Sequence, residues 1–452
     1  MFQEKQSEEA PTFWLPTSEL PNTPANSFWR RLDRVLSEFG FGDKVRELCA
    51  PYYTMNPAKG GRPGIDPEVY FKMLMVGFFE NLASERSIAA RCADSLSVRE
   101  FLHYALTEET PHHSSFTIIR QRLAQEVYES VFGLILVALK GKKLLKGKRL
   151  AIDSSVLEAN ASMRSLENRM TKEAYWDYVK RLAAKAGVDA NDPKEVKRFD
   201  RKRKGRKTSN KDWKNPHDPD ARVAPDKKRV TRMLYKPEHA VDMDTGAIVD
   251  VQLQLGDHHD AKNIASSVSE IEERMNLAIG NAPEKAVVQV FVADMGYYDL
   301  KELAELQARG IRTAVADSVR NRKLEKLSEE KLRTLRCAKR TLRSESGRAL
   351  MRRRGELCER SFEHVLDEGG ARRTTLKGQE NIFKRYLIQA ACMNLSLIMR
   401  TMTGIGTLKQ TWAAPAEAFA AIIALIRRIL SPMPQSNPSI WAWTESRVAR
   451  AP

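Results

Sequence analysis

Hydrophobic residues recur with helical spacing through the first third of the chain. Residues 28–49 carry apolar side chains three or four positions apart, which predicts an amphipathic helix. Asp66-Pro67-Glu68 combines a capping carboxylate with proline at the first helical position, so another helix is expected to begin there. Shorter helical patterns extend to residue 123, and residues 127–145 predict a longer apolar helix. The series fits a helix-turn-helix-like DNA-binding unit and a plain helical bundle equally well.

The pattern then changes to short apolar runs that are typical of strands. Residues 149–156 form the first such run, and a polar stretch of about 75 residues separates it from the next. Further strands are predicted at 239–242, 247–255, 286–293 and 311–316, with helices at 260–277 and 298–309. This order of elements predicts a mixed α/β sheet flanked by helices, preceded by an all-α N-terminal domain.

Charge is concentrated in two segments of the 452-residue chain. The net charge is +17, while residues 194–214 alone carry +8 and residues 320–354 carry +10. The remainder of the chain is thus close to neutral. Basic segments beside balanced structure favour contacts with DNA phosphates, whose affinity comes from counterion release. Trp213 lies in the first segment and is a weak candidate for base stacking.

Several classes of protein are excluded by features that the sequence lacks. The five cysteines are scattered and form no C-x-x-C pair, which argues against a disulfide framework or a zinc site. No P-loop, secretory leader pattern or membrane-length apolar run occurs. We therefore expect a cytoplasmic protein, associated with the nucleoid when bound to DNA, without a membrane partner or nucleotide cofactor.

Two of the predicted strands end in a lone aspartate. Asp153 and Asp294 follow apolar runs, and the carboxyl ends of strands are where ligands bind in α/β sheets. Oxygen ligands suit Mg²⁺, and two ions about 3.5–4 Å apart can clamp a phosphoryl transfer. A later helix offers Glu356, Glu359 and Glu363 at i, i+3 and i+7, so their spacing alone does not select a third carboxylate.

These residues and their neighbours resemble the DDE transposases of bacterial insertion sequences, over most of the chain. The matching stretches are Asp66-Pro67-Glu68, Ser114-Ser115 to Leu123, Ile152-Asp153-Ser154-Ser155, 207–213 with 218–222, Tyr235-Lys236, His239 to Asp242 with Thr245-Gly246, Ala293-Asp294-Met295-Gly296-Tyr297 and Glu359-Arg360-Ser361-Phe362. Many relatives have Tyr and Arg upstream of the glutamate and Lys beyond it. Here Arg354 is the candidate for the upstream cation, and Arg372 or Lys377 for the downstream one.

The resemblance implies a ribonuclease H-like fold in which Asp153, Asp294 and Glu359 are catalytic. They would hold two Mg²⁺ ions, with Mn²⁺ able to substitute. The implied reaction is nicking at the element's end followed by strand transfer, on terminal inverted repeats and target DNA, by a homodimer. Tyr297 and Tyr298 are candidates for base stacking or for packing. The predicted DNA contacts are Arg120, Arg122, Arg201, Lys202, Arg203, Lys204, Arg206, Lys207, Arg352, Arg353 and Arg354.

Two other functions fit the same residues. One is a ribonuclease H-like nuclease that cuts without joining, and the other is a catalytically inactive DNA-binding derivative. His239 is expected beside Asp153, where a structural role is favoured over a chemical one. The predicted division of the chain is 1–60 as a partly helical extension, 61–145 as a helical DNA-binding domain, 146–400 as the catalytic domain with basic insertions at about 160–234 and 318–354, and 401–452 as a C-terminal helix and tail.

Overall fold

The computed structural model describes residues 24–53, 64–205, 209–226, 228–258, 263–282, 285–317 and 328–411. Most of the predicted C-terminal helix and tail lies outside these residues. In the described part, no helix combines the length and apolar character needed to cross a membrane. All five cysteines are free thiols.

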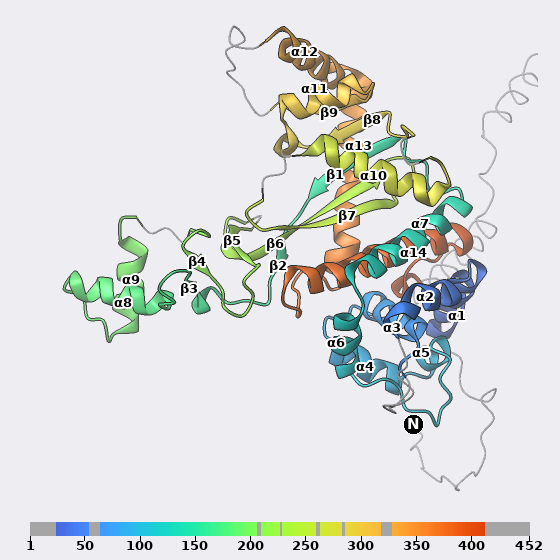
Figure 1. The fold of residues 1–452 in the computed structure, drawn as a ribbon, viewed down its shortest axis with the longest axis horizontal. Coiled ribbons are helices and arrows are strands. Elements are labelled where there is room, and N and C mark those ends of the chain that lie inside the picture. The colour runs from blue at the N-terminus through green and yellow to red at the C-terminus, as the bar shows by residue number, and fades with distance from the viewer. Residues whose placement is uncertain are drawn as a thin grey trace, which may run out of the picture.

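The N-terminal part is a cluster of helices, as predicted (Figure 1). Its helices are α1 (Pro24–Glu38), α2 (Phe41–Cys49), α3 (Pro67–Phe79), α4 (Glu85–Asp94), α5 (Leu96–Phe101), α6 (Ser114–Arg122) and α7 (Gln125–Gly141). The predicted start of α3 is confirmed, because the Asp66 side chain accepts a hydrogen bond from the Glu68 backbone N–H. Every residue from Tyr70 to Phe78 is buried, so α3 forms the centre of this cluster.

A mixed sheet follows, in the spatial order β7-β6-β1-β8-β9. Its strands are β1 (Arg149–Ser154), β6 (Thr231–Asp242), β7 (Ile248–Leu255), β8 (Val290–Ala293) and β9 (Arg312–Val315), with short β2 (Leu157–Glu158) and β5 (Arg222–Pro225) paired to β6. Strands β1, β6 and β7 are antiparallel neighbours, whereas β1, β8 and β9 run parallel. The predicted fold class, a ribonuclease H-like mixed sheet after a helical region, is confirmed.

Helices flank the sheet. The alternation of side chains along β1 and β8 sends Ala151 and Val292 to one face, where they pack against Leu350, Leu357 and Cys358 of α13 (Glu345–Phe362). Further helices complete the domain: α10 (Ile264–Ile279), α11 (Leu300–Ala308) and α12 (Glu329–Arg343).

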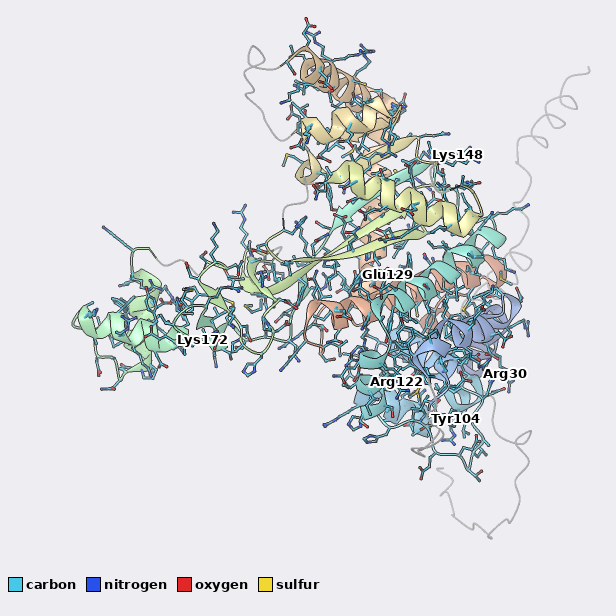
Figure 2. The ribbon with its side chains drawn as sticks, viewed as in Figure 1. Arg30, Tyr104, Arg122, Glu129, Lys148 and Lys172 are labelled. Atoms are coloured by element: carbon cyan, nitrogen blue, oxygen red, sulfur yellow. The ribbon has the colours of Figure 1, made fainter. Side chains whose placement is uncertain are left out.

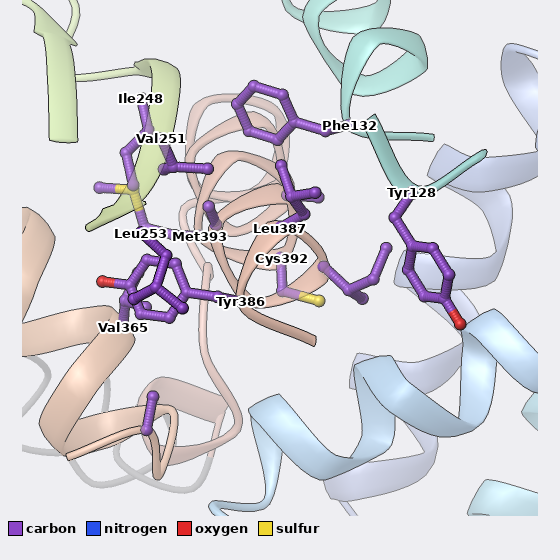
Figure 3. Packing of buried hydrophobic residues seen from close by; sticks show 14 of the residues in the cluster. Tyr128, Phe132, Ile248, Val251, Leu253, Val365, Tyr386, Leu387, Cys392 and Met393 are labelled. Atoms are coloured by element: carbon purple, nitrogen blue, oxygen red, sulfur yellow. The ribbon is translucent and has the colours of Figure 1, made fainter. Parts of the chain in front are cut away.

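The helix α14 (Gln379–Thr403) joins the sheet domain to the N-terminal helices. Figure 3 shows Tyr386, Leu387 and Met393 of α14 between the apolar side chains of β7 and those of α7. The buried Lys384 of α14 also donates a hydrogen bond to the Arg120 carbonyl in α6. The N-terminal helices and the sheet domain therefore share one continuous core.

Two basic segments were predicted as insertions, and they differ in structure. Residues 328–354 are not a loop: they form α12 and the first half of α13, because each helix buries one apolar face and exposes its cations. The earlier segment belongs to an arm that extends from the body of the molecule (Figure 1). The arm contains α8 (Tyr175–Lys185), α9 (Pro193–Lys202) and the paired strands β3 (Glu167–Asn168) and β4 (Trp213–Lys214).

Candidate active site

Asp153 and Asp294 lie side by side at the ends of two neighbouring parallel strands. Ile152 of β1 is level with Ala293 of β8, and each aspartate is the next residue along its strand direction. Alternation places both carboxylates on the face that carries Ala151 and Val292, which α13 covers. The sequence prediction that these two acids share one edge of the sheet therefore agrees with the observed register.

The Asp153 carboxylate is partly buried and paired with a cation. Arg354 of α13 donates a hydrogen bond from Nη1 to Oδ2 at 2.8 Å, and both side chains are less than one-fifth exposed. Burial raises the pKa of Asp153, the Arg354 guanidinium opposes that rise, and the negative charge of Asp294 adds to it. The two aspartates thus repel each other, and positive charge at this point stabilises the pair.

Glu359 lies on α13 at a different angle from Arg354. The face turned to the sheet includes Leu357, Cys358 and Ser361, and Glu359 is about 100° further round the helix than Cys358 and exposed. In the part of the chain that the structure describes, no three His, Cys, Asp or Glu side chains are grouped closely enough to hold a metal ion. Two of the three predicted acids therefore lie together, and Glu359 lies on the flank of the covering helix.

The neighbouring glutamates have other surroundings. Glu356 accepts a hydrogen bond from Arg360 at 2.6 Å on the outer side of α13. Glu363 is the first residue of a π-helical segment, Glu363–Glu368, that continues from α13. Such changes of winding often occur at functional sites. Cys358 points inward instead, and burial raises the pKa of its thiol to about 12 with Asp153 adding to the rise, so this thiol stays protonated.

His239 lies directly across from Asp153 in the β1–β6 register, and it is fully buried. Its Nδ1 is 2.9 Å from Ser361 Oγ, its Nε2 is 2.7 Å from the Tyr386 hydroxyl, and its ring stacks on Phe362. Ser361 donates its proton to the Cys358 carbonyl, so we assign the proton of His239 to Nδ1. The Tyr386 hydroxyl then donates to Nε2. Burial lowers the pKa of His239 to about 3, which keeps the ring neutral.

This network confirms the structural interpretation of His239: the neutral ring joins three elements through hydrogen bonds and stacking. It ties β6 to α13 and α14 at a point two residues beyond Glu359. Sequence reasoning missed Ser361 and Tyr386 as its partners, because a buried serine or tyrosine has no distinctive spacing. Only the strand register, which sets His239 opposite Asp153, could have indicated the location.

The predicted DNA contacts separate into exposed and internal cations. Arg201, Lys202, Lys204, Arg122, Arg352 and Arg353 are exposed. Arg120 is buried and bonded to Glu85, so the structure places this predicted DNA contact inside the helical cluster and away from the surface. Arg203 pairs internally with Asp200 at 2.7 Å, and Arg354 pairs with Asp153. Arg206 and Lys207 lie outside the described residues. Arg372, a candidate downstream cation, bonds to Asp367.

The aromatic candidates for base stacking are buried. Tyr297 is 2 % exposed and donates a hydrogen bond to Glu238 at 2.6 Å, and Tyr298 is 9 % exposed. Trp213 is 5 % exposed and packs edge-on against Tyr175 in the arm. Because a stacked base needs an open ring face, these three rings pack the interior and are not available for stacking.

Comparison with known proteins identifies the family. A model described as "Transposase DDE domain" matches residues 146–395, more than half of the chain. A model described as "Transposase domain (DUF772)" matches residues 19–122. The chain therefore belongs to the DDE transposase domain family, whose members act on DNA by phosphoryl transfer and generally use divalent metal ions.

A more distant likeness is found among solved structures, and none among curated proteins. The piggyBac transposase in a synaptic complex with hairpin DNA is 10 % identical with a TM-score of 0.36, over 95 % of this chain and 86 % of that chain. A similarity of this size carries no argument about the site. No curated protein matches the chain.

Proposed function

We propose that this chain is the transposase of an insertion sequence, which binds terminal inverted repeats, nicks DNA at the element's ends and transfers the strand into target DNA. One observation carries the proposal. Asp153 and Asp294 end neighbouring parallel strands on one face of the sheet, within a domain of the DDE transposase family. Carboxylates brought together at strand ends are suited to metal-assisted phosphoryl transfer.

The chemistry of the aspartate pair fits a divalent cation. Two carboxylates on one face repel each other, and the pKa of Asp153 is raised by burial and, in smaller part, by the negative charge of Asp294. We infer that Asp153, Asp294 and Glu359 hold two Mg²⁺ ions, for which Mn²⁺ can substitute. When bound, the ions would supply Lewis-acid stabilisation of the attacking and leaving oxygens.

The chain's own cations would position the DNA. Arg352 and Arg353 are exposed on α13, the helix that covers the aspartates, so a phosphate backbone lying over this helix would meet them first. Arg354 is turned inward to Asp153 and would help to hold that carboxylate in place. Cutting two ends together calls for a dimer on DNA, which we propose without assigning its interface.

The helical N-terminal part is the proposed reader of the inverted repeats. Arg122 at the end of α6 is exposed and is labelled in Figure 2. Its guanidinium lies over the Tyr53 ring, 4.8 Å from the ring centroid. The proposed domains keep their predicted bounds: residues 61–145 bind DNA, and residues 146–400 carry the catalytic sheet.

Glu359→Gln is expected to lower metal-dependent cleavage by about 10³-fold, because several kcal/mol of charge stabilisation is lost with the carboxylate. Glu356→Gln is the matched control, since Glu356 is on the same helix and pairs with Arg360 on its outer side. The measurement is nicking of an end-labelled duplex that carries the DNA flanking the gene. Loss of cutting in Glu356→Gln with Glu359→Gln still active would keep the function and reassign the third acid.

A further inference from the structure

The helix α9 carries a continuous basic stripe along one side. Lys194, Lys197, Arg198 and Arg201 are spaced i, i+3, i+4 and i+7, which places them on one helical face, and all four are exposed. Only Arg201 of these four belongs to the predicted DNA contacts. The stripe extends about 10 Å along the helix axis, which corresponds to about three base-pair steps of duplex DNA.

The opposite side of α9 is fixed to the arm. Val196 and Asp200 are buried, and Asp200 accepts hydrogen bonds from the Tyr175 hydroxyl at 3.0 Å and from Arg203 at 2.7 Å. Tyr175 in turn packs against Trp213. These contacts set the rotation of α9, so the basic stripe is held outward.

Few carboxylates of the protein pair with the cations of the stripe. Among the ion pairs of the described residues, Arg198 pairs with Glu195 at 2.7 Å, whereas Lys194, Lys197 and Arg201 have no carboxylate partner. Three uncompensated cations in a row are available to an external anion. The stripe consists of cations with no amide side chains between them. Such a surface is suited to binding DNA phosphates, which fix the position of the DNA. It is less suited to binding base edges, which specify the sequence.

The arm lies away from the aspartate pair, because α8 and α9 extend from the body of the molecule beyond the end of the sheet (Figure 1). We propose that this arm is a DNA-holding element: the α9 stripe binds the backbone of duplex DNA at a distance from the scissile phosphate and independently of sequence. The proposal rests on the proposed function only in taking DNA as the substrate. It adds Lys194 and Lys197 to the proposed DNA surface and removes Arg203, which pairs with Asp200 inside the arm.

The test is the salt dependence of DNA binding by the full-length chain in EDTA, where no cutting occurs. The variant Lys194→Gln/Lys197→Gln/Arg201→Gln is compared with Lys172→Gln/Lys180→Gln/Lys185→Gln. The second variant removes the same charge from exposed positions of the arm off the stripe, including the labelled Lys172 (Figure 2). The probes are two fluorescent duplexes, one with the element's end and one of unrelated sequence.

The stripe variant is expected to reduce the slope of log K against log salt by about 2.7, at about 0.9 for each lost phosphate contact. Between about 50 and about 200 mM salt, wild-type affinity should then fall about 40-fold more than that of the stripe variant, on both duplexes. The control should keep the wild-type slope. An unchanged slope in the stripe variant, an equal change in the control, or a loss confined to one duplex would overturn the proposal. Binding is measured here without cleavage. A wild-type chain that fails to cut DNA would therefore contradict the proposed function, but the salt dependence of binding would still test whether the α9 stripe contacts DNA.

Discussion

Asp153→Asn and Asp294→Asn are each expected to abolish DNA cleavage while DNA binding stays close to wild type. Asparagine keeps the shape of the side chain but loses the charge that a metal ion requires, and a loss of about 10³-fold or more is expected from the missing charge stabilisation. The measurement pairs nicking of an end-labelled duplex in Mg²⁺ with binding of the same duplex in EDTA. Equal loss of binding in both variants would contradict the metal-site assignment.

Asp299→Asn is the matched control for this prediction. Asp299 lies five residues beyond Asp294 and caps α11 by accepting hydrogen bonds from the Lys301 and Glu302 backbone N–H groups. Asparagine is about as good a cap as aspartate, so this variant should fold and cut like wild type. Asp153→Asn also leaves Arg354 facing a neutral partner, so its fold is checked by circular dichroism before its activity is compared.

His239→Phe is expected to lower the free energy of unfolding by about 2–4 kcal/mol. The substitution keeps a ring against Phe362 but removes the acceptor of the buried Tyr386 hydroxyl and one of the two hydrogen bonds of Ser361, which still donates to the Cys358 carbonyl. Each such loss at a buried group costs about 1–3 kcal/mol. The measurement is equilibrium denaturation in guanidinium chloride. Hydrogen exchange should also rise in the second half of α13, because the hydrogen bond between Ser361 and His239 helps to fix this half to β6.

A double mutant isolates the hydrogen bond. Tyr386→Phe alone removes one partner of His239, whereas His239→Phe with Tyr386→Phe removes both, so the double variant should be less destabilised than the sum of the single variants by about 1 kcal/mol or more. Strict additivity would mean that the two side chains do not stabilise each other. The same loosening of α13 should slow cleavage, since Glu359 lies two residues before Ser361 on that helix.

The edge of the sheet that carries the two proposed catalytic aspartates could be predicted from the sequence because its signals are local. Apolar runs that end in a lone aspartate marked β1 and β8, and the parallel register then placed Asp153 beside Asp294. Asp66 followed by proline gave the start of α3 for the same reason, since a cap acts within a few residues. In each case the chemistry that decides the structure lies within one element.

The burial and the partners of individual cations and aromatic rings could not be predicted, because they depend on packing between segments that are distant in the sequence. Arg120 is a cation at the end of a basic helix and was predicted to contact DNA, yet it is buried in an ion pair with Glu85 of another helix. Tyr297 follows the proposed catalytic Asp294, yet its hydroxyl donates a hydrogen bond to Glu238 on β6. Residues 328–354 have the composition of a basic loop, and only the apolar partners of α12 and α13 make them helices that cover the sheet.

A joining assay with the full-length wild-type chain distinguishes the proposed transposase from a nuclease and from an inactive DNA-binding protein. A labelled duplex carrying the element's end is incubated with a target plasmid, in Mg²⁺ and separately in EDTA. A transposase is expected to give metal-dependent nicks at a defined end and labelled DNA joined to the plasmid. Nicks without joined product would identify a nuclease, and salt-sensitive binding without any cutting would identify an inactive DNA-binding protein; either result would contradict the proposed transposase.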